Sequence, residues 1–358
     1  MALTQVQPGM LGTPQPYSFK NRIINGAMVI SQRGTSGTAT SAGSMVLDRF
    51  VLYSSNTTPA VTQSSDAPAG FVNSLLWTQS SAATRSAGDY YEIGHKIEGY
   101  NIADLNLGTA NAKTFTVSFW VKSSVTVTYS FAMRNAGVTY AAYVSTYTIS
   151  VANTWQQVGV TITGATAGTW NTTNGDGLEL WIDLGSGSTY QTSTYNSWIY
   201  GNGNALSAAS QVGFAQTSGA TFYITGVQLE VGVSATTFDY RAYGQELVLC
   251  QRYCYRVDAS SNANGQFIVG FIYDASNFYG ILPIPIQMRA SPSLTTTGSF
   301  RVNWAGGGGT VSGSVTINQA LPNSVWVNAP ISGGTVGSGA DLASNASTST
   351  ALTLSAEL

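Results

Sequence analysis

Few residues in this chain have side chains that could carry out chemistry, and the carboxylates are the first to consider. Glu92, Glu98 and Asp104 lie in the most charged stretch of the N-terminal half, and Glu179 and Asp183 lie four residues apart on a predicted strand. Glycoside hydrolysis needs two carboxyl groups about 5 to 9.5 Å apart across a groove. Residues four apart on one strand are separated by about 13 Å. We therefore expect solvated or turn carboxylates and no catalytic residue.

A nucleophilic triad and a nucleotide site are also not expected. His95 is the only histidine, and no Gly-x-Ser-x-Gly motif precedes it, which favours a surface or groove histidine. The glycine run 306–309 lacks the Lys-Ser/Thr pair that follows a phosphate-binding loop and indicates a flexible turn. The sequence therefore predicts that the protein is not an enzyme.

An aromatic stretch offers the strongest candidate for ligand contact. Residues 190–200, with the sequence YQTSTYNSWIY, interleave three tyrosines and one tryptophan with amide and hydroxyl residues. Loops of this composition can stack rings on sugar faces while they hydrogen-bond to hydroxyl groups. We expect a glycan to be bound by Tyr190, Tyr195, Asn196, Trp198 and Tyr200. The alternative is that the tryptophan and one tyrosine fill the core.

The composition excludes several classes of protein. Only 8% of the 358 residues are charged and the formal net charge is -2, whereas ordinary globular chains carry about 25% charged residues. Helical bundles and coiled coils need charged solvent faces, and nucleic-acid binders need basic ones, so neither is expected. The 43% hydrophobic fraction is enough for a sizeable core. Polarity supplied by Ser, Thr, Asn and Gln, with 39 glycines, is typical of β-rich extracellular or virion-surface proteins.

Short β-type runs separated by turn residues recur along the chain, at 46–53, 90–93, 115–122, 125–131, 155–162, 178–184 and 221–230. The run 115–122 alternates apolar and polar residues and predicts a half-buried strand. Many short strands without helical patterns indicate an all-β fold, a jelly-roll β-sandwich. Strand patterns resume after residue 257 and predict a second, smaller β-sandwich domain.

The predicted organisation has four parts. Residues 1–20 contain three prolines and little periodicity and are interpreted as an N-terminal attachment arm. The jelly roll occupies 21–243, and a linking helix is expected over 244–256, where Leu247, Cys250 and Cys254 share one face. The C-terminal β domain spans 257–358. No apolar run reaches the roughly 18 residues of a membrane helix, and the N-terminus lacks the pattern of a secretory signal.

Two stretches resemble a known family. The opening 21–34, NRIINGAMVISQRG, followed by 48–50, DRF, resembles the start of a family of bacteriophage tail-fibre and virion-appendage proteins. The closing 227–232, VQLEVG, with 246–253, ELVLCQRY, is similar to the same family. Between these stretches, the runs 115–122, 155–162 and 222–230 resemble the jelly roll of carbohydrate-binding modules attached to polysaccharide hydrolases. The last hundred residues resemble no family that we can name.

The resemblance implies a function and partners. The chain would be a structural subunit of a phage virion, made in the host cytoplasm, and would serve as a tail fibre that attaches to host surface glycans. Its arm would bind other virion proteins, and it would form a homotrimer in which Leu247, Cys250 and Cys254 pack about the threefold axis. Neither nucleic acid nor a membrane is an expected partner. The alternatives are a head-decoration or tail-connecting protein without host contact and, less favoured, a polysaccharide depolymerase.

No cofactor is expected beyond a structural calcium ion. Jelly-roll modules of the resembled kind often bind one through backbone carbonyls and a carboxylate. In this chain Asp48 and Glu230 could contribute that carboxylate.

Overall fold

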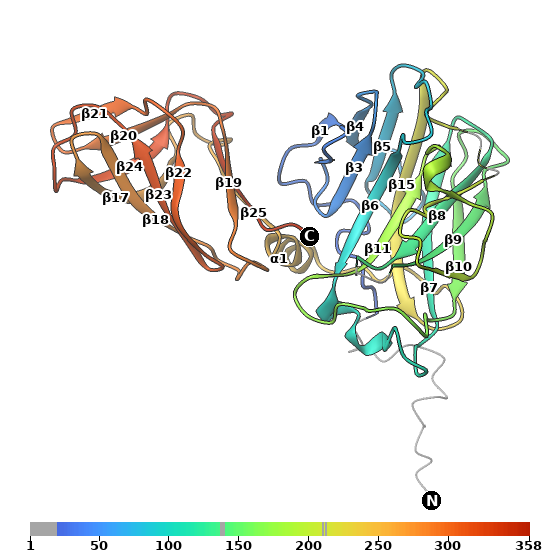
Figure 1. Ribbon diagram of the computed structural model, residues 1–358. Coiled ribbons are helices and arrows are strands. Elements are labelled where there is room, and N and C mark those ends of the chain that lie inside the picture. The colour runs from blue at the N-terminus through green and yellow to red at the C-terminus, as the bar shows by residue number, and fades with distance from the viewer. Residues whose placement is uncertain (1–19, 137–139, 210, 212) are drawn as a thin grey trace, which may run out of the picture. The chain divides into compact units, whose positions relative to one another are not determined.

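The computed structural model describes residues 20–136, 140–209, 211 and 213–358, so the predicted arm lies outside them apart from Lys20. The described chain divides into two compact units (Figure 1). The first contains the described residues up to Val29 together with Ser36–Val46 and Phe50–Arg241. The second consists of Ala242–Leu358 and two short N-terminal segments, Ile30–Thr35 and Leu47–Arg49. Each unit is therefore built from segments that are separated in the sequence.

The first unit contains two large antiparallel sheets. The six-stranded sheet has the order β1 (Ser36–Thr38), β4 (Ala60–Ser64), β5 (Ser74–Gln79), β15 (Ala220–Val231), β7 (Phe115–Ser123) and β10 (Gln156–Ile162). The seven-stranded sheet has the order β13 (Trp198–Tyr200), β9 (Ala141–Thr148), β8 (Thr128–Arg134), β11 (Asp176–Asp183), β6 (Tyr91–Glu98), β3 (Phe50–Ser54) and β2 (Ser44–Met45). Shorter elements are η2 (Gly99–Asn101), η3 (Ala103–Leu105), η4 (Ser188–Tyr190), β12 (Gln191–Thr192) and β14 (Ser207–Ala208).

Buried aromatic rings join the two sheets into a sandwich. Phe119 on β7 packs edge-on against Phe131 on β8, with ring centroids 5.7 Å apart. Tyr129 on β8 lies 5.4 Å from Phe222 on β15. The alternation predicted for 115–122 places its apolar residues in this core. The strand is nevertheless buried on both faces. On the face away from the core, Thr116 is covered by the Gly232 segment and donates a hydrogen bond to the Gly232 carbonyl, at 2.9 Å. The prediction of a half-buried strand is therefore wrong.

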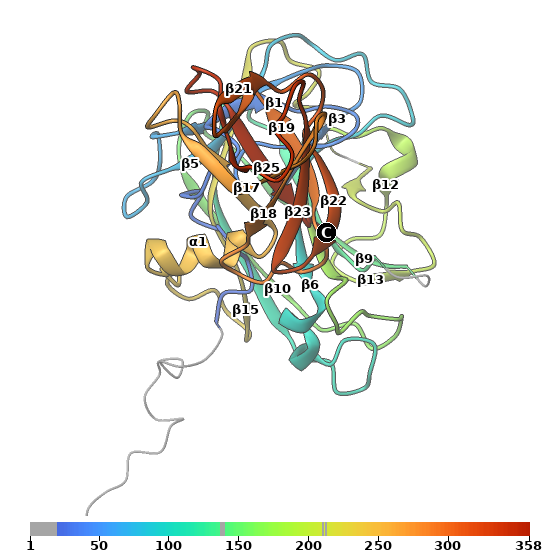
Figure 2. The same ribbon diagram turned by 90° about the vertical axis from the view of Figure 1, so that its left-hand side faces the viewer.

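The second unit is another β-sandwich. Its three-stranded sheet has the order β16 (Cys254–Asp258), β25 (Ala351–Ser355) and β19 (Ser293–Thr297). Its seven-stranded sheet has the order β21 (Gly307–Thr310), β20 (Phe300–Trp304), β24 (Gly339–Ser344), β17 (Gln266–Asp274), β18 (Asn277–Pro283), β23 (Ser324–Pro330) and β22 (Thr316–Leu321) (Figure 2). Leu352 and Leu354 of the small sheet pack in one core with Ile272, Phe278 and Leu342 of the large one.

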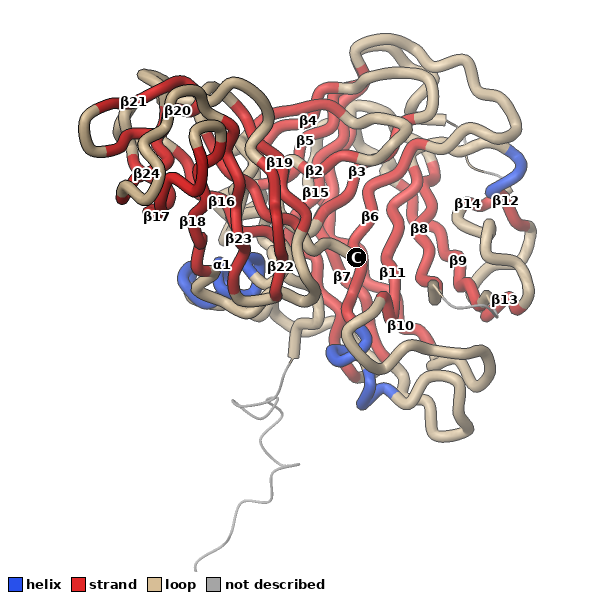
Figure 3. The backbone as a smooth tube through the Cα atoms, turned by 60° about the vertical axis from the view of Figure 1, so that its left-hand side comes forward, coloured by secondary structure: helices blue, strands red, loops and turns tan. Residues whose placement is uncertain are grey.

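These observations confirm the predicted all-β fold class. Strands run through both units, and helix occurs in the described residues only as α1 (Tyr243–Gln251) and short 3-10 turns (Figure 3). No helix of the described chain has both the length and the apolar character needed to cross a membrane.

The predicted linking helix is shorter than expected. It ends at Gln251 instead of continuing to residue 256, because Cys254 already pairs with Ser355 in the β16–β25 ladder. Leu247, Cys250 and Cys254 therefore do not share one helix face. Both cysteines are free thiols with no exposed surface, and burial raises the pKa of Cys254 to about 12. Within the monomer they already serve as core residues.

A polar cluster holds the two short N-terminal segments inside the second unit. The Asp48 carboxylate accepts a hydrogen bond from the Gln32 backbone N–H at 3.0 Å, and the Gln32 side chain donates to the Cys254 carbonyl at 2.7 Å. Arg33 binds Glu357 at 3.0 Å, and buried Arg49 pairs with the same carboxylate. We call these five side chains (Gln32, Arg33, Asp48, Arg49 and Glu357) the polar cluster.

Candidate functional site

Strand alternation collects polar and aromatic side chains on one face of the seven-stranded sheet in the first unit. On β6, Glu92, Gly94 and Lys96 alternate with residues of the sandwich core. The register places Glu92 opposite Asp183 of β11 and Gly94 opposite Trp181. Cross-strand partners project to the same side of a sheet, with Cβ atoms about 5 Å apart. The sequence pattern of these two strands therefore builds a common surface.

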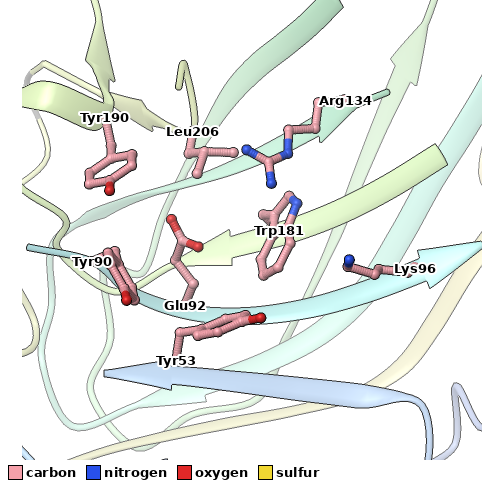
Figure 4. Close-up of a pocket in the computed structure, with 8 residues that line it drawn as sticks. All are labelled: Tyr53, Tyr90, Glu92, Lys96, Arg134, Trp181, Tyr190 and Leu206. Carbon is pink, nitrogen blue, oxygen red and sulfur yellow. The ribbon is translucent and has the colours of Figure 1, made fainter. Parts of the chain in front are cut away.

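A pocket of about 190 Å³ lies on this surface (Figure 4). The residues that line it are Tyr53, Tyr90, Glu92, Lys96, Arg134, Trp181, Tyr190 and Leu206. Gly94 makes the floor possible, since a Cβ at this position would lie 2.2 Å from the Trp181 ring. Any larger residue would displace the indole from the sheet.

Four aromatic rings follow one another around the pocket. Tyr53 lies 5.8 Å from Trp181, and the ring of Tyr90 also lies 5.8 Å from that of Tyr53, at 79°. Tyr190 continues the series, 5.8 Å from Tyr90 at 85°. Trp181 is buried and the three tyrosines are half-buried. The planes of these rings differ in orientation, so apolar ring surfaces face the pocket from several directions.

A charged network forms one wall. The Arg134 Nε pairs with Glu179, and the same carboxylate accepts a hydrogen bond from the Trp181 indole at 2.8 Å. Lys96 Nζ lies 3.2 Å from Asp176 and 3.6 Å from Glu179. Burial alone would raise the pKa of Glu179, but Arg134 and Lys96 hold it below its ordinary value. The wall is therefore fixed by ion pairs before any ligand arrives.

Glu92 differs from the other carboxylates. It is 4% exposed, and among the described residues its Oε1 has no hydrogen-bond partner. Burial, together with repulsion from Asp183, raises the pKa of Glu92 to about 8. Asp183 instead accepts hydrogen bonds from the backbone N–H groups of Gly185 and Ser186, at 3.0 and 3.1 Å, and from the Ser207 hydroxyl, at 2.9 Å. Figure 4 shows the Glu92 carboxyl rising from β6 into the space between the rings.

The predicted loop 190–200 does not form one binding surface. Only Tyr190 of its five candidate residues lines the pocket. Tyr195 packs against the neighbouring apolar cluster, and Asn196 accepts a hydrogen bond from Ser145 at 2.7 Å. Trp198 packs edge-on against Trp170 and donates from its indole to the Thr163 carbonyl at 2.7 Å. Tyr200 is 46% exposed. The structure therefore disperses the predicted set.

Several other expectations need correction. Glu92, Glu98, Glu179 and Asp183 are buried, not solvated. His95 is 1% exposed and not a surface residue, since alternation on β6 turns it toward the core, where its ring lies 5.0 Å from Phe50.

The two proposed calcium ligands belong to different units of the structure. Asp48 belongs to the second unit and is engaged in the polar cluster, whereas Glu230 belongs to the first. The Glu230 carboxylate accepts hydrogen bonds from Gln228 at 2.8 Å and from the Thr236 hydroxyl at 2.6 Å. Within the described ranges, no group of three or more His, Cys, Asp or Glu is placed to hold a metal ion. Calcium binding by either carboxylate alone stays a prediction.

Sequence reasoning missed most of the pocket, although a signal was present. In the run 178–184, LELWIDL, the three residues Glu179, Trp181 and Asp183 alternate with apolar residues. In 91–97, YEIGHKI, Glu92 and Lys96 alternate in the same way. Charged and aromatic residues at period two on adjacent strands indicate a functional sheet face.

Comparisons with known proteins concern the fold. No family model matches the chain, and no curated protein matches its sequence. Among solved structures, the enzymatically active domain of bacteriophage CBA120 tailspike protein 4 is 14% identical over 59% of this chain and 21% of that chain, with a TM-score of 0.33. The N-terminal cellulose-binding domain of Cellulomonas fimi β-1,4-glucanase C is 14% identical over 52% of this chain and 90% of that domain, with a TM-score of 0.30. The family 11 carbohydrate-binding module of Clostridium thermocellum is 9% identical over 56% of this chain and 99% of that module, with a TM-score of 0.28.

This chain therefore spans about a fifth of the tailspike structure. At these identities and TM-scores the comparisons do not confirm membership of a tail-fibre family.

Proposed function

We propose that this chain binds glycans at the pocket around Glu92. The observation that carries the proposal is a series of four aromatic rings around a buried carboxyl group whose Oε1 has no hydrogen-bond partner in the described chain. Sugars present apolar C–H faces together with hydroxyl groups. Binding sites for such ligands combine aromatic walls with a few fixed polar groups. The pocket meets both requirements.

The size of the pocket suits a short part of a glycan. Its volume of about 190 Å³ is below the roughly 300 to 1,000 Å³ of sites that enclose drug-sized ligands. A single site of this kind binds weakly, and several copies on one particle would give stable adhesion.

We further propose that the chain is a structural subunit of a bacteriophage virion that attaches to host surface glycans. This proposal is supported by the resemblance of 21–34, 48–50 and 227–253 to virion-appendage proteins and by the low charge of the chain. It includes a homotrimer and an arm, 1–20, that binds other virion proteins. Since Cys250 and Cys254 are buried in their own unit, the partly buried Leu247 is the predicted trimer contact that retains accessible surface.

Two alternatives are less favoured. A head-decoration or tail-connecting protein would not need the pocket. A depolymerase would need a second carboxyl group free to act with Glu92, but its cross-strand neighbour Asp183 is fully engaged by three hydrogen-bond donors. We therefore propose a binding protein and not an enzyme.

Affinity electrophoresis of the purified chain in gels containing neutral or acidic bacterial polysaccharides tests the glycan proposal. We expect retardation that Tyr53→Ala and Tyr190→Ala each weaken by about tenfold or more, as loss of a binding hot spot does. Tyr200→Ala is the matched control, because this tyrosine is exposed outside the pocket. Retardation abolished by the control but not by the pocket variants would place the site on the loop 190–200. No retardation by any polysaccharide would reject glycan binding.

The virion assignment needs separate measurements. Labelled antibody on purified particles should mark a tail or surface appendage, and no labelling would reject a structural role in the virion. Sedimentation should give three copies. A stable 37.5 kDa monomer at micromolar concentration would reject the trimer.

A further inference from the structure

The unpartnered oxygen of Glu92 carries an inference about what the pocket selects, and this inference rests on the proposed glycan binding. We infer that Glu92 presents an O–H group to the ligand and that the pocket therefore prefers an uncharged sugar whose hydroxyl or carbonyl oxygen can accept a hydrogen bond. The argument begins with the groups that face this carboxyl from each neighbouring element.

No cation forms an ion pair with Glu92 in the described chain, and the attraction of Arg134, which lowers the pKa of this carboxyl, is smaller than the opposing effects of burial and Asp183. Arg134 on β8 pairs with Glu179 and donates to the Gly203 carbonyl at 2.9 Å. Lys96, further along β6, lies within 3.6 Å of Asp176 and Glu179. A buried carboxylate without a cation or hydrogen-bond donors is strongly disfavoured relative to the neutral acid.

The remaining neighbours are acidic or neutral. Asp183 on β11 stands directly opposite Glu92, as does Tyr53 on β3. Tyr90 donates its hydroxyl proton to the Ser41 carbonyl at 2.9 Å, and Tyr190 of η4 closes the far side. Two adjacent carboxyl groups do not ionise together readily. Asp183 receives three hydrogen bonds and Glu92 Oε1 none, so Glu92 is the one that retains the proton.

A protonated carboxyl group is a hydrogen-bond donor, whereas a carboxylate can only accept. The ligand atom beside Glu92 must therefore be an acceptor oxygen. The nearby cations Arg134 and Lys96 already contact the acidic groups Glu179 and Asp176, so both are engaged before an anionic sugar could bind. An uncharged sugar fits both conditions. A protonated amino sugar would require Glu92 to ionise first.

The test compares Glu92→Gln with Glu92→Leu in the full chain, by calorimetric titration at pH 6.5 and pH 9.5. The probes are three soluble oligosaccharides of similar length: neutral cello-oligosaccharide, chitosan oligomer and oligogalacturonate, together with any neutral polysaccharide that retards the chain. The amide of Gln keeps an N–H donor but cannot titrate. We expect wild-type binding of a neutral probe to weaken about tenfold at pH 9.5. We expect Glu92→Gln to bind at both pH values with the affinity that the wild type has at pH 6.5, and Glu92→Leu to bind about tenfold more weakly than the wild type at pH 6.5.

The outcomes separate the two proposals. If the wild type binds no probe at pH 6.5, glycan binding fails and the inference fails with it. If the wild type binds a neutral probe but Gln is as weak as Leu, or binding strengthens as pH rises, Glu92 acts as an acceptor and the inference alone is overturned. Preference for the chitosan oligomer would overturn it as well.

The protonation state can be read without a ligand. In the 13C-glutamate-labelled full chain, the carboxyl signal that disappears in Glu92→Gln should report a neutral acid at pH 7. A carboxylate signal at this pH would overturn the inference.

Discussion

Each unit contains a seven-stranded sheet with one face turned away from its sandwich core, and the two faces differ in what they bury. In the first unit this face carries Glu92, Glu179, Asp183 and Trp181, all at most 4% exposed. The corresponding face in the second unit exposes Val269 by 76%, Ile281 by 62% and Tyr273 by 58%. Charged residues are thus buried on the face in the first unit, whereas apolar residues are exposed on the face in the second.

The covering segment explains the difference. Residues 184–209 pass over the seven-stranded sheet of the first unit. There Ala205 and Leu206 pack with Val51, Ala132 and Trp181, and the Ala208 N–H donates to the Ser130 hydroxyl at 2.8 Å. This cover removes water from the carboxylates and supplies donors to Asp183. On the seven-stranded sheet of the second unit, four aromatic rings form an uncovered row. The centroids of successive rings lie 6.5, 5.2 and 5.2 Å apart, in the order Phe271, Tyr273, Tyr279 and Trp326. The cover thus gives the first unit a pocket that includes buried charged groups, whereas the uncovered face of the second unit holds an apolar pocket of about 380 Å³ beside Val269, Ile281 and Trp326.

The largest effect that tests this comparison is loss of a tryptophan. Trp181→Ala should destabilise the first unit by about 3 to 5 kcal/mol, as for other buried large-to-small changes. Trp326→Ala, on the open face, should cost the second unit about 1 kcal/mol because much less area is returned to water. Differential scanning calorimetry measures both. Equal losses would show that the second face is also covered in solution.

A smaller effect concerns pH. Because burial raises the pKa of Glu92 from 4.5 to about 8, its folded state binds the proton more tightly than the unfolded state does. The stability that this proton contributes is fully present below pH 4.5 and is lost as pH rises through 8, by about 3 to 4 kcal/mol between pH 5 and pH 8. Unfolding in urea at several pH values should show this slope. Glu92→Gln should reduce it to the part that Asp176 contributes, because burial and Glu179 raise the pKa of Asp176 to about 7.

Asp66→Asn is the control for this slope. A hydrogen bond from Lys122 lowers the pKa of Asp66, so this carboxyl stays ionised between pH 5 and pH 8 and its substitution should leave the slope in that range intact. A slope as steep in Glu92→Gln as in the wild type would assign it to another group.

Ser207→Ala tests the loop cover at the level of one hydrogen bond. The variant removes the donor that lies 2.9 Å from Asp183 and should cost about 1 to 3 kcal/mol, since a buried acceptor loses a partner. Ser218→Ala, which removes an exposed hydrogen bond of 3.4 Å to the Ser80 carbonyl, should change stability by less than about 0.5 kcal/mol. Similar values for both variants would contradict the proposed role of the cover.

The smallest expected effect is on the open face. Ile281→Thr and Val269→Thr should each change the stability of the second unit by less than about 0.5 kcal/mol in urea unfolding, because both side chains are mostly exposed. A loss above 1 kcal/mol would show that another surface covers this face in solution.

The sequence was sufficient for the fold class and insufficient for the pocket, for identifiable reasons. Period-two runs such as 115–122 predict strands because alternation depends on neighbours in the sequence. The pocket depends on register between strands far apart, as when Glu92 meets Asp183, and on a cover whose path is not encoded in a local pattern. The composition of 190–200 drew attention to the covering segment, although only Tyr190 of its candidates reaches the pocket.

The helix shows the same limit on a smaller scale. The spacing of Leu247, Cys250 and Cys254 fits one helical face. Cys254 nevertheless lies on a strand, where it pairs with Ser355, 101 residues later in the chain. Tertiary pairing overrides a local periodicity that is only two turns long.

The polar cluster gives the second unit an unusual dependence on the order of synthesis. Arg33 and Arg49 leave the ribosome early, yet the carboxylate that they share belongs to Glu357, which lies 324 and 308 residues later. Until that residue appears, Arg33 has Asp48 nearby, at 3.8 Å, but the buried Arg49 lacks its Glu357 partner, and breaking such a buried pair costs about 3 to 5 kcal/mol. The second unit therefore reaches its full stability only when position 357 has been added, and a chain stopped before it should be more sensitive to proteases.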